Sequence, residues 1–203
     1  MKNPTDNTAP PAGGELVQLR CVSSNDGAEP EGVLAIGADG TLYGTTYYAG
    51  PNSCPNLFDG PAFGCGTVFQ LTPPTSPGGT WGYAVIYSFT GANGDGALPT
   101  AGVVMGKNGA LYGTTSAGGS AASESACPPS YNAFGGCGIV FELTPPTTPG
   151  GIWTETILHS FSGQNGDGAT PLAALALSSS GVLYGTTSAG GAAGRGTVFA
   201  VAP

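Results

Sequence analysis

The sequence predicts an all-β protein in which one four-stranded unit is written three times. The pentapeptide Leu-Tyr-Gly-Thr-Thr occurs at residues 42–46, 111–115 and 183–187. The same flanking motifs surround each copy, and short runs of β-branched and aromatic residues lie between Gly, Pro, Asn and Asp. Such runs are typical of strands joined by tight turns, and no apolar stripe of helical period lies between the glycines.

The composition agrees with many short strands in one domain. The chain of 203 residues is long enough for a sizeable core, although only 8% of its residues are charged. It contains 37 glycines and 18 prolines. An aperiodic sequence this rich in Gly and Pro would indicate low complexity, whereas here the glycines fall at fixed places in the repeat. They therefore indicate tight turns.

The second copy shows the order of the elements most clearly. Its expected strands cover residues 101–105, 110–115, 137–144 and 153–161. Turns at 93–99, 107–109 and 145–151, and a Gly/Ser-rich insertion at 116–136, separate these strands. The alternation is plain in the fourth strand of the first copy, where Tyr83, Val85 and Tyr87 alternate with smaller or aliphatic residues.

The third copy lacks a fourth strand. The copies span about residues 26–89, 95–161 and 167–203, and the sequence ends where the fourth strand of the third copy would follow. Residues 15–22 resemble residues 155–161 and lead into a similar Asn/Asp/Gly turn. We therefore expect residues 15–22 to complete the last unit.

The start of the chain is expected to lie outside the repeats. Residues 1–14 are polar, contain Pro10 and Pro11, and lack the apolar stretch of a signal peptide. We interpret them as a flexible leader that precedes a single repeat domain at residues 15–203.

A unit divided between the two ends of the chain favours a β-propeller-like fold. Propellers close their ring in this way, and they typically contain about four to eight blades. The sequence leaves open whether the front strand completes the last unit of its own chain or that of a neighbouring chain. Because three units are few, two chains could form a six-bladed ring through such a strand, or many chains a head-to-tail filament. A β-trefoil, which also has threefold internal repetition, is the alternative.

Four motifs recur together in this chain. They are Asp-Gly-Ala-x-Pro, Leu-Tyr-Gly-Thr-Thr, Gly-Thr-Val-Phe, and a strand that begins with Trp and ends in Ser-Phe-Thr/Ser-Gly. Over about residues 15–203 this pattern resembles the GloVer tandem repeat of bacterial extracellular and surface-anchored proteins. The resemblance implies export, a surface or matrix location, and no known catalytic residues. This chain differs in having few repeats, long insertions in two of them and no visible anchor segment.

Cysteines occur in pairs in the two long insertions. The first copy contributes Cys54 and Cys65, the second contributes Cys127 and Cys137, and the third has a short link without cysteine. Both cysteines are present in the copies with a long insertion, and both are absent from the copy without one. In an exported protein this pattern predicts the disulfides Cys54–Cys65 and Cys127–Cys137. Free buried thiols or a zinc site are the alternatives, although no histidines accompany these cysteines. Cys21 is left over and is expected to be a buried free thiol.

The charge excludes two classes of partner. The net charge is −8, and the basic residues are Lys2, Arg20, Lys107 and Arg195. Four scattered cations are too few to neutralise a nucleic acid backbone or to hold an anionic membrane surface. No apolar run approaches the roughly 20 residues of a membrane span.

The residue types offer little catalytic machinery. The one histidine, His159, has no Ser or Cys nucleophile motif beside it, so we expect no enzyme. Only an inward cluster of Asp26, Asp95 and Asp167 would favour catalysis. The Asn-Gly-Asp-Gly loops could bind calcium or could simply be turns. The weak calcium candidates are Asn93, Asp95, Asn165 and Asp167.

Aromatic residues also recur at fixed positions, as Tyr43, Tyr112 and Tyr184 and as Trp81 and Trp153. Repeated rings can form sugar-binding sites, although packing between units is the simpler interpretation. We therefore expect a secreted, non-catalytic protein with a structural, self-assembling or adhesive role. The alternative is a carbohydrate-binding protein with a glycan partner.

Overall fold

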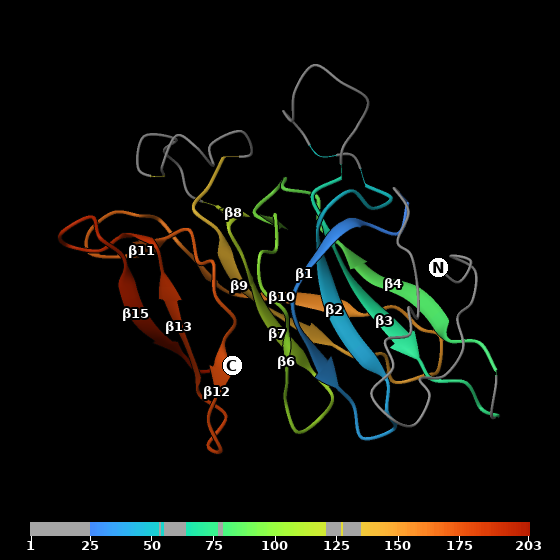
Figure 1. Cartoon of the computed structure of the whole chain (residues 1–203). Coiled ribbons are helices and arrows are strands. Elements are labelled where there is room, and N and C mark those ends of the chain that lie inside the picture. The colour runs from blue at the N-terminus through green and yellow to red at the C-terminus, as the bar shows by residue number, and fades with distance from the viewer. Residues whose placement is uncertain (1–24, 53, 55–63, 77–78, 121–126, 128–134) are drawn as a thin grey trace, which may run out of the picture.

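The computed structural model describes residues 25–52, 54, 64–76, 79–120, 127 and 135–203 (Figure 1). Every regular element in these residues is a strand, and all the sheets are antiparallel, which confirms the all-β prediction. No sheet in the described part of the chain closes on itself. The leader, the expected strand at 15–22 and Cys21 lie outside the described residues.

The three copies form three antiparallel sheets, which we call units 1 to 3. Unit 1 contains β1 (Ala28–Ile36), β2 (Leu42–Tyr48), β3 (Thr67–Thr72) and β4 (Gly82–Ser88) in that order. Unit 2 contains β6 (Val104–Met105), β7 (Leu111–Thr115), β9 (Ile139–Thr144) and β10 (Thr154–Ser160), paired in the same order. Unit 3 contains β12 (Ala176–Leu177), β13 (Leu183–Thr187) and β15 (Thr197–Val201). Figure 1 shows the units side by side in chain order.

Two short ladders lie outside these sheets, and the sequence did not predict them. β5 (Gly96–Ala97) pairs with β8 (Ala117–Gly118), and β11 (Gly168–Ala169) pairs with β14 (Ala189–Gly190). Each ladder joins the turn that enters a unit to the segment that follows its Leu-Tyr-Gly-Thr-Thr strand. The first expected strand of unit 2 is correspondingly shorter than 101–105, because its ladder covers only Val104–Met105.

The glycine of the recurring pentapeptide makes room for a phenylalanine on the next strand. Gly113 pairs directly with Phe141, and a Cβ atom at Gly113 would lie 2.5 Å from Cζ of that ring. The register is the same in the other units, where Gly44 pairs with Phe69 and Gly185 pairs with Phe199. The motif therefore encodes a ring lying across a glycine, an arrangement that pins strand register.

Leading into each unit, one non-glycine residue holds a left-handed backbone conformation. Glu29, Leu98 and Thr170 occupy the same repeat position and have φ values of 56°, 58° and 56°. The Leu98 N–H donates to the carbonyl of Cys65, and the Thr170 N–H donates to the carbonyl of Cys137. In units 2 and 3 these hydrogen bonds tie the strained residue to the preceding unit and so help to hold its conformation.

The core lies between the units. Val68 and Phe89 of unit 1 pack with Leu111, Ile139 and Phe141 of unit 2. The contact recurs one unit later, where the buried residues are Val140, Phe161, Leu175 and Leu183, with Phe199 packed against them. Phenylalanine rings meet at both places, with centroids 5.2 Å apart for Phe89–Phe141 and 5.1 Å apart for Phe161–Phe199.

Each unit thus has two different faces. We call the face toward the preceding unit the leading face; in unit 2 it carries Leu111 and Phe141. We call the opposite face the trailing face; it carries Val68 in unit 1 and Val140 in unit 2.

Gly113→Ala should destabilise the protein, because the added methyl group has no space beside the Phe141 ring. The expected loss is about 1–3 kcal/mol in the free energy of unfolding, the usual cost of overpacking a core. The measurement is denaturant unfolding. Gly82→Ala is the matched control, since the nearest atom to its Cβ would be 3.6 Å away. Equal stability of the two variants would contradict the role assigned to the glycine.

Candidate functional site

The two end faces of the row of units expose residues that are buried wherever a neighbouring unit is present. Val68 and Val140 on the trailing faces of units 1 and 2 are 0% exposed, whereas the equivalent Val198 of unit 3 is 82% exposed. Within the described residues, the trailing face of unit 3 therefore lacks the neighbour that covers the other two.

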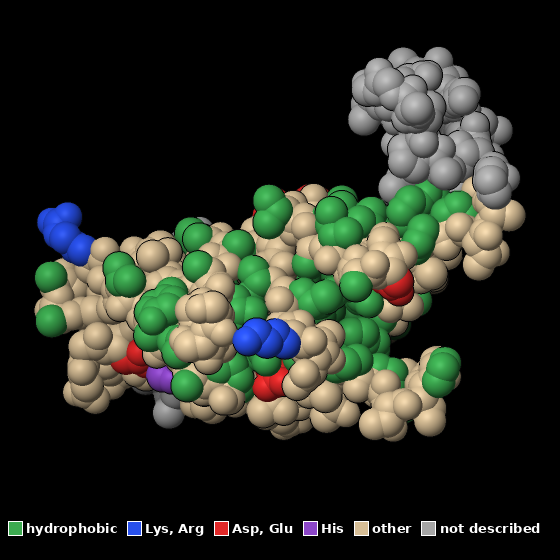
Figure 2. All heavy atoms as spheres, turned by 90° about the horizontal axis from the view of Figure 1, so that it is seen from below, with side chains coloured by type: hydrophobic (Ala, Val, Ile, Leu, Met, Phe, Trp, Pro, Cys, Tyr) green, Lys and Arg blue, Asp and Glu red, His purple; other side chains and the backbone are tan. Residues whose placement is uncertain are grey.

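Leu34 on the leading face of unit 1 shows a similar contrast, whereas Phe69 and Leu71 on the same face are only 4% and 7% exposed. Val103 of unit 2 and Leu175 of unit 3 are 1% and 5% exposed, while the equivalent Leu34 of unit 1 is 48% exposed. Ile36 is exposed beside it. Figure 2 shows the molecule from below, where charged side chains are few and scattered among hydrophobic and polar ones. Each end of the row therefore exposes apolar side chains, Val198 and Tyr184 on unit 3 and Leu34 and Ile36 on unit 1, of the kind that usually meet a partner.

The aspartates of the Asn-Gly-Asp-Gly loops hold their own turns. Asp95 Oδ2 accepts hydrogen bonds from the N–H and the hydroxyl of Thr90, at 2.7 and 2.6 Å, and Oδ1 accepts one from the Gly96 N–H at 2.6 Å. Asp167 accepts the same set from Ser162 and Gly168. Both carboxylates therefore act as clamps between the outer strand of one unit and the entry to the next.

The asparagines of the Asn-Gly-Asp-Gly loops have the backbone conformation of turn residues. Asn93 and Asn165 adopt the positive φ values of turn residues, 56° and 53°. No three His, Cys, Asp or Glu side chains gather into a metal site in the described part of the chain, so Asp26, Asp95 and Asp167 form no common cluster. Calcium binding by the loops stays a prediction.

His159 takes part in the second clamp. It occupies the repeat position of Tyr87, its Nε2 lies 3.1 Å from Asp167 Oδ1, and its ring packs edge-on against Phe161. Partial burial alone would raise the pKa of Asp167. The hydrogen bonds from Ser162, His159 and Gly168 outweigh this effect and lower the pKa of that carboxyl below its usual value.

A buried carboxyl links units 1 and 2, and sequence reasoning missed it. The Tyr87 hydroxyl on β4 donates to Glu155 Oε2 on β10 at 2.8 Å. Burial, together with the nearby charge of Asp95, raises the pKa of Glu155 to about 7. The available signal was that Glu155 stands where the first copy has an aromatic residue, Tyr83.

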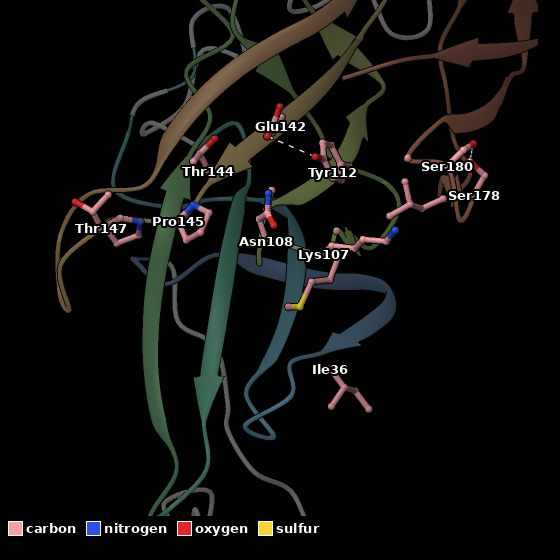
Figure 3. Close-up of a pocket in the computed structure, with 16 residues that line it drawn as sticks. Ile36, Lys107, Asn108, Tyr112, Glu142, Thr144, Pro145, Thr147, Ser178 and Ser180 are labelled. Carbon is pink, nitrogen blue, oxygen red and sulfur yellow. Dashed lines mark hydrogen bonds between the residues drawn. The ribbon is translucent and has the colours of Figure 1, made fainter.

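The recurring aromatic residues lie in different surroundings. Tyr43 and Trp153 meet edge-on across units 1 and 2, with ring centroids 6.0 Å apart. Trp81 is partly buried just before β4, and Tyr184 is 47% exposed on the trailing face of unit 3. Tyr112 lines a hollow of about 800 Å³ at the hairpin ends of units 2 and 3 (Figure 3).

Polar groups surround Tyr112 in this hollow. Figure 3 shows its hydroxyl directed toward Glu142, and it donates to Oε1 at 3.5 Å. Lys107 and Asn108 lie on the adjacent hairpin, and Lys107 Nζ donates to the carbonyl of Ser179 in unit 3 at 3.2 Å. Burial, together with the Glu142 charge, raises the pKa of the Tyr112 hydroxyl. None of these polar neighbours was singled out from the sequence.

Both expected disulfides are present, Cys54–Cys65 and Cys127–Cys137, with Cα atoms 5.0 and 5.2 Å apart. They lie in the buried clusters between units. Disulfides of this kind fit an oxidising compartment. Among the described residues, no helix is long and apolar enough to cross a membrane.

The sheets, the recurring motifs and the repeated contacts describe one tandem repeat. The family profile of the Gloeobacter/Verrucomicrobia repeat matches residues 59–203. The chain belongs to this repeat family. The match confirms the resemblance to the GloVer repeat that the recurring motifs indicated. No curated protein matches the chain.

The buried carboxyl of this Gloeobacter/Verrucomicrobia repeat protein should give stability a specific pH dependence. The pKa of Glu155 is about 7 in the folded protein and about 4.3 in an unfolded chain. The folded state therefore holds an extra proton between these values, and the free energy of unfolding should fall as pH rises from about 4 to 7. Glu155→Gln should remove roughly 1–2 kcal/mol of that fall.

Denaturant unfolding at a series of pH values measures this effect. Glu31→Gln, at an exposed position of β1, is the control and should follow the wild-type profile. If Glu155→Gln also follows the wild-type profile through this pH range, the buried carboxyl does not titrate as described.

Proposed function

We propose that this protein is a non-catalytic, extracellular building block that assembles head to tail. The trailing face of unit 3 docks on the leading face of unit 1 of a second copy. One observation carries the proposal: Val198 is 82% exposed, while its two equivalents are fully buried under a following unit. An apolar residue that is covered in every internal contact is expected to be covered in the working assembly as well.

The two internal contacts serve as a template for the contact between chains. The trailing faces carry Tyr and Val at the same positions throughout, and Tyr184 and Val198 repeat Tyr112 and Val140. The leading faces carry Leu and Phe at equivalent positions, including Leu42 and Phe69 in unit 1. Phe69 is already 4% exposed in the single chain, so Leu34 and Ile36 are the leading-face residues that a second copy would cover.

This pairing joins two different faces and is heterologous, so it generates rings or filaments. Two chains that dock in this way contribute six units, within the usual range of about four to eight blades for a propeller. A closed ring of two chains leaves neither end face bare. This is the form of propeller that we propose, with the units of each chain as its blades.

The disulfides and the repeat family support a location outside the cell, at the bacterial surface or in the matrix around it. A non-catalytic role is in keeping with Asp95 and Asp167, whose carboxylates already bind their own turns. A protein whose units repeat the same pair of faces is suited to a structural or adhesive role.

Val198→Asp should block association, because a carboxylate would have to be buried against the leucine and phenylalanine of the neighbour. The wild type is expected to form dimers or larger species as its concentration rises, and the variant is expected to stay monomeric. Size-exclusion chromatography with light scattering measures the mass. Ile152→Asp is the matched control, since Ile152 is 89% exposed but lies on neither end face.

A mixing experiment tests the direction of docking. Leu34→Asp damages only the leading face of unit 1, and Val198→Asp damages only the trailing face of unit 3. Each variant should be monomeric alone, whereas the mixture should contain dimers, because each variant keeps the face that the other has lost. A wild type that stays monomeric at high concentration, or a mixture without dimers, would contradict head-to-tail assembly.

A further inference from the structure

The contact between units 2 and 3 differs from the contact between units 1 and 2 in one respect. Between units 1 and 2, Trp153 packs against Tyr43. In the next contact Tyr112 takes the place of Tyr43, but unit 3 has no described counterpart of β10, the strand that follows Trp153. At this place Tyr112 lines the hollow of about 800 Å³ shown in Figure 3.

The lining of the hollow has an apolar part and a polar part. Ile36, Met105 and Leu177 occupy one repeat position in the three units and contribute apolar side chains to the lining, with Ile36 at the far side of the hollow from Tyr112 (Figure 3). Glu142 contributes a carboxylate, and Lys107 an ammonium group. Asn108, Ser178 and Ser180 add an amide and hydroxyls from the two hairpins. Concave sites with an apolar lining and a few convergent polar groups are typical of small-molecule binding.

The polar groups identify the kind of ligand. An indole has a single N–H donor and no acceptor. It can therefore hydrogen-bond to the carboxylate but leaves the ammonium group without a partner. At the first contact, where an indole is present, the residue equivalent to Glu142 is the uncharged Gln70. A pyranose ring has both features that the hollow requires, a C–H face for an aromatic ring and hydroxyl groups around its edge.

We propose that this hollow binds the pyranose ring of a neutral sugar. The electron-rich face of Tyr112 receives the C–H groups of the sugar. Glu142 accepts hydrogen bonds from sugar hydroxyls, and Lys107 and Asn108 donate hydrogen bonds to them. One carboxylate and one ammonium group cancel in charge, which favours a neutral sugar over an anionic one.

The hydrogen bond between the Tyr112 hydroxyl and Glu142 is long, at 3.5 Å, so the carboxylate can turn to the ligand at little cost. All the residues of the site belong to a single chain. The inference therefore does not rest on head-to-tail assembly, and either proposal can fail without the other.

Saturation-transfer NMR on the full chain tests the proposal with the methyl pyranosides of glucose, galactose, mannose and N-acetylglucosamine as probes. At least one pyranoside should receive saturation at its ring C–H groups. Tyr112→Ala should weaken its binding about tenfold or more. Tyr184→Ala is the matched control, because Tyr184 occupies the same repeat position but lies outside the hollow. This variant should bind the pyranoside as tightly as the wild type does.

Glu142→Gln is a second variant for the case that Tyr112→Ala does not fold. It is expected to fold, because unit 1 carries a glutamine at the equivalent position. It should weaken binding of the same pyranoside while leaving the thermal unfolding midpoint unchanged. Three results would overturn the proposal: no transfer to any of the four pyranosides, binding by Tyr112→Ala or Glu142→Gln equal to that of the wild type, or binding of tryptophanamide in place of the sugars.

Discussion

The packing of one unit's trailing valine beneath the next unit's leading phenylalanine is the contact on which the structure depends. Val68 and Val140 are completely buried in the two clusters between units, and beside them the ring pairs Phe89–Phe141 and Phe161–Phe199 recur at nearly the same spacing. A single four-stranded sheet with two apolar faces cannot bury both by itself, so each unit needs a neighbour on either side. Val198 of unit 3 and Leu34 of unit 1 are exposed because no further unit packs against them among the described residues.

Much of the remaining structure serves this contact. The glycine of the pentapeptide leaves room for the phenylalanine of the next strand, and Leu98 and Thr170, which lead into units 2 and 3, donate hydrogen bonds back to carbonyls of the disulfide cysteines. The aspartate clamps fix the chain where it passes from one unit to the next. Because the backbone hydrogen bonds and the aspartate clamps cross between units, loss of one of them should loosen the stacking before it unfolds a sheet.

The sequence was sufficient for the strands, the turns and the cysteine pairs, because each depends on local residue types or on paired gain and loss between copies. Strand residues 110–115 were expected and Leu111–Thr115 was found. The faces of the sheets were harder to predict. Tyr43 and Tyr112 are identical in sequence, yet one packs on Trp153 and the other lines a hollow, because the difference lies on another unit. Glu155 was missed for the same reason, since its pKa is raised by burial between the units and by the charge of Asp95 on a neighbouring segment.

Negative-stain electron microscopy of the purified wild-type chain at rising concentration tests the central claim most directly. Head-to-tail stacking on the internal template predicts closed rings with six lobes, or filaments in which the units follow one another without a break. Images that show only isolated three-lobed particles at every concentration, or pairs joined through two identical faces, would contradict it.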